Sequence, residues 1–148
     1  MGEGGRIRTV SVFLRNPEGK VIAQLRDDKP DILFPACWSM LGGRVEDNET
    51  PDEAVRRELI EEIEVCPPLT FWRLFAHQFP IGDRIYDVEI YAYVGDIDVS
   101  ASEIRLHEGQ RVEFLSREDI DRLPFAFRLD ALYREFFKAY DGHAGGDV

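Results

Sequence analysis

Residues 43–65 constrain this chain more than any other stretch. They begin with a glycine, continue through a short loop and then become strongly acidic. Thr50 is a good N-cap, Pro51 suits the first helical position, and Glu53 stands where a capping box requires a carboxylate. We therefore predict that a helix starts at Thr50.

The predicted helix has an apolar side and an acidic side. Residues four apart form the apolar stripe: Val55, Leu59 and Ile63. Glu58, Glu61 and Glu62 occupy positions i, i+3 and i+4, so they project from one face. Like charges at this spacing destabilise a helix by roughly 0.2–0.5 kcal/mol per pair. A hard cation such as Mg²⁺ or Mn²⁺ would offset this repulsion, because it prefers carboxylate oxygens, water and phosphate as ligands. The alternative is a solvated acidic helix face.

The spacing of this stretch resembles the Nudix box, G-x5-E-x7-R-E-L-x-E-E-x-x-V. The matching residues are Gly43, Glu49, Arg57, Glu58, Leu59, Glu61, Glu62 and Val65. One position departs, because Glu64 stands where the box has a glycine that would serve as a left-handed C-cap. Either Glu64 adopts that strained conformation or the helix ends differently.

The resemblance implies an α/β fold, a Nudix-type α/β/α sandwich in which a mixed sheet carries a loop-helix-loop motif. It implies that Glu61 and Glu62 are metal ligands, with the carbonyl of Gly42 as another. Glu58 would be a base or a metal-bridging group, and Arg57 would hold the box carboxylates. Gly43 and Glu49 would be structural: Gly43 would permit a backbone path that a Cβ blocks, and Glu49 would pair with an arginine or brace the loop.

A second segment, residues 107–110, is similar to the one that carries a fourth catalytic carboxylate in MutT-like Nudix proteins. There a Glu-Gly-Gln loop precedes the last strand, and Glu108 takes the place of that carboxylate. Glu108 is thus implied as a metal ligand or base. Three rivals remain open: Glu89, Glu103 and Glu113. Glu89 is the strongest rival if its face of a predicted strand opens to a cleft.

Two aromatic residues are candidates for substrate binding. Trp38 precedes a double glycine and is either a core residue or a base-stacking platform. Phe127 stands roughly where the MutT-like branch that removes oxidised guanine nucleotides carries a base-reading asparagine. Because Phe127 has no amide, the resemblance argues against 8-oxo-dGTP as the substrate.

Composition limits the class of protein. At 148 residues the chain fits one domain, 1–148, with 1–5 and 142–148 expected to be flexible. No apolar run approaches the length of a membrane span, and no leader indicates secretion. The net charge of −11 argues against a long nucleic-acid partner. We expect a cytoplasmic protein with a small phosphorylated substrate, a nucleotide by resemblance, and leave a homodimer open.

The remaining chain reads as strands and two further helices. We predict a hairpin from 7–15 and 20–25, an irregular segment over 32–41, and strands over 69–79, 84–94 and 111–115. A short strand is predicted at 103–106, a Ser116-capped helix at 117–122 and a helix over 127–140. The loops 26–37 and 95–107 are expected to set substrate choice.

The sequence therefore predicts Mg²⁺-dependent hydrolysis of a pyrophosphate linkage in a nucleoside triphosphate or nucleotide-sugar. Two alternatives stay open: a catalytically silent nucleotide sensor and an RNA 5′-end pyrophosphohydrolase, which the acidic charge disfavours. An isoprenoid diphosphate isomerase also exists among relatives of this fold, but Cys37 and Cys66 lie in no motif that supports it.

Overall fold

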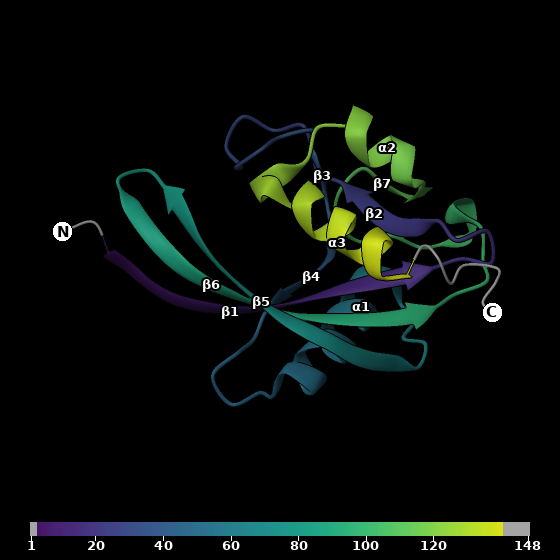
Figure 1. The fold of residues 1–148 in the computed structure, drawn as a ribbon, viewed down its shortest axis with the longest axis horizontal. Coiled ribbons are helices and arrows are strands. Elements are labelled where there is room, and N and C mark those ends of the chain that lie inside the picture. The colour runs from purple at the N-terminus through teal and green to yellow at the C-terminus, as the bar shows by residue number, and fades with distance from the viewer. Residues whose placement is uncertain (1–2, 141–148) are drawn as a thin grey trace.

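The computed structural model describes residues 3–140, and it contains one mixed sheet with helices against both faces (Figure 1). The strands are β1 (Glu3–Arg15), β2 (Val21–Leu25), β3 (Trp38–Ser39), β4 (Leu41–Arg44), β5 (Leu69–Ile81), β6 (Arg84–Asp96) and β7 (Arg111–Leu115). The helices are α1 (Pro51–Ile63), α2 (Arg117–Arg122) and α3 (Asp130–Tyr140). The expected α/β fold with a mixed sheet is confirmed.

β1 is the centre of the sheet. The strand order is β3-β2-β1-β6-β5, with β4 also paired to β1 and β7 to β2. β1 and β6 are parallel over nearly their full length, and the other pairs are antiparallel. The expected hairpin of β1 and β2 is limited to its turn, at the pair Arg15–Val21, because β4 occupies that edge of β1 from Thr9 to Val12.

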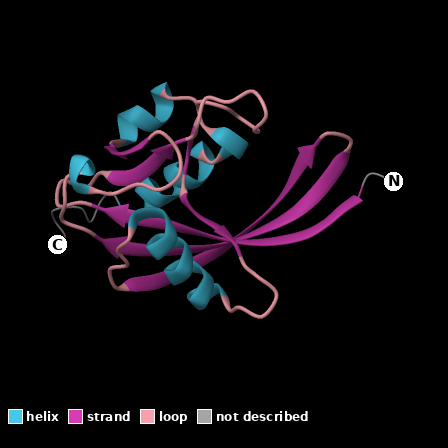
Figure 2. Cartoon of the chain, turned by 180° about the vertical axis from the view of Figure 1, so that it is seen from behind, coloured by secondary structure: helices cyan, strands magenta, loops and turns pink. Residues whose placement is uncertain are grey.

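Three strands continue past the body of the protein. Residues 3–8 of β1, 76–81 of β5 and 84–89 of β6 form a three-stranded extension, which we call the arm (Figures 1 and 2). β1 begins at Glu3, and Glu3 and Gly5 pair with β6, so part of the segment expected to be flexible belongs to a strand. Residues 1–2 and the expected flexible tail, 142–148, lie outside the described residues.

Two hydrophobic cores lie on opposite faces of the sheet. One packs beneath α1, where the predicted stripe of Val55, Leu59 and Ile63 is buried. Figure 2 shows α1 crossing this face. The other core packs beneath α3 and contains Phe13 and Phe136, which stack with their ring centroids 4.7 Å apart. Both faces of the sheet are therefore covered, as the sandwich requires.

Several element boundaries differ from expectation. The predicted strand at 103–106 is wrong, because a short 3₁₀ turn forms at Ala101–Glu103. The last helix begins at Asp130 rather than at Phe127, since Phe127 and Arg128 have φ values of 55° and 57°, which interrupt a helix. Among residues 3–140, no helix has the length and apolar content needed to cross a membrane.

Candidate active site

The acidic helix forms as its sequence predicts. The side chain of Thr50 accepts a hydrogen bond from the backbone N–H of Glu53, and the Glu53 carboxylate accepts one from the N–H of Thr50, which completes the capping box. The helix is thereby fixed at its start. The acidic side of α1 faces β4 at Gly42.

Glu62 is the most buried of the acidic residues on α1. Its side chain is close to the sheet, and its Oε1 accepts a hydrogen bond of 3.1 Å from the backbone N–H of Gly42. Burial raises the pKa of Glu62 to about 8, and the neighbouring charges of Glu58, Glu108 and Glu61 act in the same direction. The N–H of Gly42 opposes this shift, and a bound cation would supply a compensating positive charge.

Glu58 shares this environment in milder form. Burial raises its pKa, and the charges of Glu61 and Glu108 add to the effect, while Arg57 opposes it. Glu61 is more exposed and lies 3.3 Å from Arg57 Nη1. The exposure of the three acidic side chains on this face of α1 therefore increases from Glu62 through Glu58 to Glu61.

Arg57 holds several carboxylates at once. Its Nε and Nη2 donate to the two oxygens of Glu49 at 2.6 and 2.9 Å, and its Nη1 donates to Glu58 at 3.0 Å. Its Nη2 also donates to the carbonyl of Arg44 at 3.1 Å. The bidentate pairing with Arg57 is the main cause that lowers the pKa of Glu49 to about 2. Glu49 also braces its loop, because its Oε1 accepts from the N–H of Glu46.

The loop at 107–110 brings Glu108 beside the acidic face of α1. Glu108 lines the same hollow as Glu62, together with Gly42, Gln24 and six further residues: Arg26, Asp27, Ile32, Ser39, Met40 and Gly109. We call this hollow, of about 250 Å³, the acidic hollow. Residues far apart in the sequence are thus placed around one space.

The three rivals of Glu108 lie elsewhere. Glu89 is on the α1 side of β6 and lies 3.8 Å from Arg6. The face of β6 that borders a cavity is the opposite one, with Val88 and Ile90. Glu103 accepts hydrogen bonds from Ser100, and Glu113 pairs with Arg111 at 3.1 Å. None of the three lines the acidic hollow.

The carboxylates suit a hard divalent cation by their chemistry. Within residues 3–140, no three acidic, His or Cys side chains are already close enough together to ligate one ion. Even so, the charge of Glu108 adds to the raised pKa of both Glu58 and Glu62, so negative charge is concentrated here. Oxygen-only donors around such a charge fit Mg²⁺ or Mn²⁺ rather than a softer metal.

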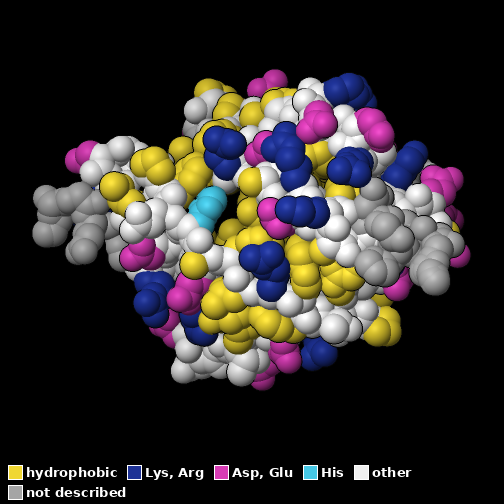
Figure 3. Space-filling view, viewed as in Figure 1, with side chains coloured by type: hydrophobic (Ala, Val, Ile, Leu, Met, Phe, Trp, Pro, Cys, Tyr) yellow, Lys and Arg dark blue, Asp and Glu magenta, His cyan; other side chains and the backbone are white. Residues whose placement is uncertain are grey.

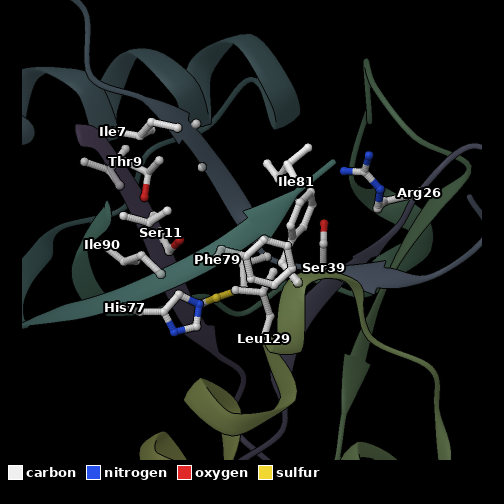
Figure 4. Close-up of a pocket in the computed structure, with 16 residues that line it drawn as sticks. Ile7, Thr9, Ser11, Arg26, Ser39, His77, Phe79, Ile81, Ile90 and Leu129 are labelled. Carbon is white, nitrogen blue, oxygen red and sulfur yellow. The ribbon is translucent and has the colours of Figure 1, made fainter. Parts of the chain in front are cut away.

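An apolar cavity of about 270 Å³ adjoins the acidic hollow. Figure 4 shows side chains that line it, and Figure 3 shows the surface hollowed between the arm and the body. Four residues line both spaces: Arg26, Ser39, Met40 and Gly42. The two spaces therefore lie next to each other.

The aromatic candidates have different positions. Phe127 lines the apolar cavity and contacts Phe34 and Phe79, with ring centroids 4.7 and 5.2 Å away. Trp38 is only 5% exposed, packs in the core beneath α3 and has Arg111 over its ring. It is not among the residues that line the cavity. Phe127, and not Trp38, therefore borders the apolar cavity.

Sequence reasoning missed most of the cavity. His77, Phe79 and Ile81 line it from the arm, and Arg26 lines it from the end of β2. The loop 95–107, expected to set substrate choice, contributes no lining residue to either space. The alternation of apolar residues along β5 was the sequence signal for these lining residues. It does not show which face of the strand a distant loop covers.

Comparison with known proteins is decisive for the family. The NUDIX domain model matches residues 5–138. The chain belongs to the Nudix family. A Nudix hydrolase of Deinococcus radiodurans is 36% identical over 75 residues, 51% of this chain and 44% of that protein. An 8-oxo-dGTP diphosphatase of Proteus vulgaris is 48% identical over 44 residues, 29% of this chain and 39% of that protein. The matches thus span less than half the length of these curated relatives.

Solved structures support the same fold. A MutT protein from Methanosarcina mazei has a TM-score of 0.69 at 21% identity, covering 95% of this chain and 96% of that one. The dihydroneopterin triphosphate pyrophosphohydrolase of Escherichia coli has a TM-score of 0.69 at 17% identity, covering 87% and 93%. At these identities the likeness shows the Nudix fold alone.

The departure from the Nudix box at Glu64 does not prevent a left-handed helix cap. Glu64 is in the left-handed conformation, with a φ of 67°, and its N–H donates to the carbonyl of Ile60. Of the two outcomes left open, Glu64 therefore adopts the conformation that the glycine would have. Its carboxylate binds His107, which is the main cause of its lowered pKa.

The two glycines before the Nudix helix are needed for different reasons. Gly42 has a φ of 144°, and a Cβ there would overlap the backbone of Val10 in β1. Gly43 has no such φ, and a Cβ there would overlap the Glu58 carboxylate. The unusual backbone path that we expected at Gly43 is therefore found at Gly42. Gly43 instead leaves room for the side chain of Glu58.

Substituting these two glycines should separate stability from activity. We expect Gly42→Ala to lower the melting temperature strongly, because β1 must shift. We expect Gly43→Ala to leave it nearly unchanged and to lower kcat about tenfold, since the flexible Glu58 side chain can move away. Calorimetry and steady-state kinetics on both variants check this. Equal losses of stability in the two variants would contradict it.

Proposed function

We propose that this Nudix protein hydrolyses the pyrophosphate linkage of a nucleoside diphosphate derivative, such as a nucleoside triphosphate or nucleotide-sugar, with Mg²⁺ or Mn²⁺. The observation that carries this proposal is the junction of the apolar cavity with the acidic hollow. A flat base fits the first space, and a diphosphate with its cations fits the second. The relatives named as a diphosphatase and a pyrophosphohydrolase are consistent with it.

The residues would share the work as follows. Glu58, Glu61, Glu62 and Glu108, with the carbonyl of Gly42, would hold the cation. When bound, the cation would neutralise phosphate oxygens. Water would attack one phosphorus, the bridging P–O bond would break, and two phosphorylated products would leave.

One carboxylate must take the proton of the attacking water. Glu58 and Glu108 are the candidates. Both have other carboxylates close by, and both lie at the acidic face of α1. A well-placed base typically contributes about 10²–10⁴-fold to the rate. Arg57 would act indirectly, by orienting Glu58 and Glu61 through its Nη1.

The apolar cavity also bears on which nucleobase the substrate carries. Its lining is mainly apolar and aromatic, with the polar side chains of Thr9, Ser11, Ser39, His77 and Arg26. Among residues 3–140, no Asp, Glu, Asn or Gln side chain lines it. The lining therefore favours recognition of a ring by shape and stacking over the bidentate reading of a guanine edge.

A substrate panel tests the proposed function. Nucleoside triphosphates, nucleotide-sugars and dinucleoside polyphosphates would be incubated with Mg²⁺, and the products identified by phosphorus NMR. We expect at least one compound to yield two phosphorylated products. We expect Glu61→Gln and Glu62→Gln to lose at least 10²-fold in kcat, and Glu113→Gln, on β7, to retain the wild-type rate.

The panel has clear contrary outcomes. If the wild-type protein hydrolyses none of these compounds, the enzymatic proposal is wrong. Tight binding without product would instead support a nucleotide sensor. If Glu62→Gln matches the wild type, the assignment of the acidic hollow is wrong.

A further inference from the structure

The end of α1 and the loop at 107–110 are joined by a side-chain hydrogen bond that the glycine of the Nudix box could not make. Glu64, at the position of the box glycine, binds His107 Nε2 with its Oε2. The backbone of Glu64 is in the left-handed conformation, with a φ of 67°. An otherwise unexplained departure from the motif is therefore connected to the residue that precedes Glu108.

The loop is attached to the body on two sides. On the α1 side, the N–H of His107 donates to the carbonyl of Glu62 at 2.9 Å. On the β2 side, Gln24 donates to the carbonyl of Glu108, and the N–H of Gln110 donates to the carbonyl of Leu25 at 2.8 Å. The Glu64–His107 pair is the side-chain contact on the α1 side, next to Glu62.

This attachment acts against a repulsive force. Glu108 and Glu62 line the same hollow, and two charged carboxylates facing one space repel each other. On the α1 side, a backbone hydrogen bond and the Glu64–His107 pair oppose this force within the described residues. The Glu64–His107 pair thus helps to set the spacing between the carboxylates of Glu62 and Glu108.

We propose that Glu64 and His107 are positioning residues, which fix the place of Glu108 relative to Glu62 and thereby favour binding of a divalent cation between the two. The inference rests on the proposed function, because it assumes that these carboxylates bind the cation. Both partners are about half exposed, at 43% and 51%, so the pair adds little to global stability. Its effect should therefore appear in metal affinity and rate rather than in the melting temperature.

Restoring the box glycine is the sharpest test. A glycine has no penalty at the φ of residue 64, so we expect Glu64→Gly to keep or raise the melting temperature of the metal-free protein. We expect the same variant to bind Mn²⁺ alone about tenfold more weakly, and to lose about tenfold in kcat/KM, as for other residues that orient metal ligands. Mn²⁺ binding is measured by electron paramagnetic resonance, which does not depend on turnover.

Further variants separate positioning from a general loss of charge. His107→Ala keeps the backbone N–H, so its loss should match that of Glu64→Gly, and the double variant should be no worse than either. Glu64→Gln keeps an acceptor for His107 and should restore most of the affinity. Asp121→Asn breaks a comparable exposed pair with Arg134 between α2 and α3, and it should leave Mn²⁺ binding unchanged.

The outcomes distinguish the two proposals. If the wild type binds Mn²⁺ and turns over substrate but Glu64→Gly does both equally well, the positioning role is overturned and the proposed function stands. Additive losses in the double variant also overturn it. If the wild type neither binds Mn²⁺ nor hydrolyses any compound of the panel, both proposals fail together.

Discussion

Replacing Glu62 with glutamine is expected to make the metal-free protein more stable while abolishing turnover. Glu62 is 6% exposed, and its pKa is raised to about 8 by burial and by neighbouring carboxylates. The charged form is therefore disfavoured in the folded state. We expect Glu62→Gln to gain roughly 2 kcal/mol of unfolding free energy at pH 8, or about 5 °C in melting temperature.

The pH dependence has a definite sign. In the metal-free wild type, the folded state holds a proton on Glu62 more tightly than the unfolded state does. The stability from this group is therefore fully present below pH 4.5, the ordinary value, and is lost as the pH rises toward 8. The glutamine variant should show a flatter profile over this range. Thermal unfolding without metal, from pH 5 to pH 9, measures the difference.

Adding the cation should reverse the order of stability. Mg²⁺ at saturating concentration should raise the melting temperature of the wild type, because only the folded state presents the ligands together. Glu62→Gln should respond weakly and should remain inactive. A variant that is less stable than the wild type at pH 8 without metal would show that the Glu62 charge is compensated by the protein itself.

Replacing Arg57 with glutamine is expected to have the second largest effect. Arg57 contacts Glu49, Glu58 and Glu61 together with the carbonyl of Arg44. Without it, several carboxylates lose their positive partner and Glu58 loses its orientation. We expect kcat to fall about 10²-fold and the melting temperature to fall by about 5 °C.

Two variants provide the controls for Arg57. Arg56→Gln removes the same charge from the neighbouring, exposed position of α1, and it should retain kcat within about twofold. Adding Glu49→Gln to Arg57→Gln removes one unpaired carboxylate, so it should recover part of the melting temperature but not kcat. Recovery of kcat in the double variant would mean that Arg57 acts only on the stability of the loop.

The Nudix helix could be predicted from sequence because its determinants are local. Thr50 and Glu53 cap it, and Val55, Leu59 and Ile63 bury one side, all within 14 residues. The network of Arg57 with Glu49 and Glu58 is also local, because its members lie within residues 49–58. The same holds for Ser116, whose side chain caps α2 as expected.

The cavity could not be predicted because it depends on contacts between distant segments. Phe127 lines it in a left-handed conformation, which a sequence read for helical periodicity does not reveal. His77 and Phe79 line it only because β5 extends into the arm beside β1 and β6. The metal, the substrate, the dimer and the cytoplasmic location stay predictions.

A crystal of the wild-type protein soaked in Mn²⁺, with its anomalous diffraction measured, tests the central claim most directly. We predict an anomalous peak at the acidic hollow, in contact with Glu62 and Glu58 of α1 and with Glu108. A peak only at another acidic surface, or no peak with Glu58, Glu62 and Glu108 turned into solvent, would contradict it.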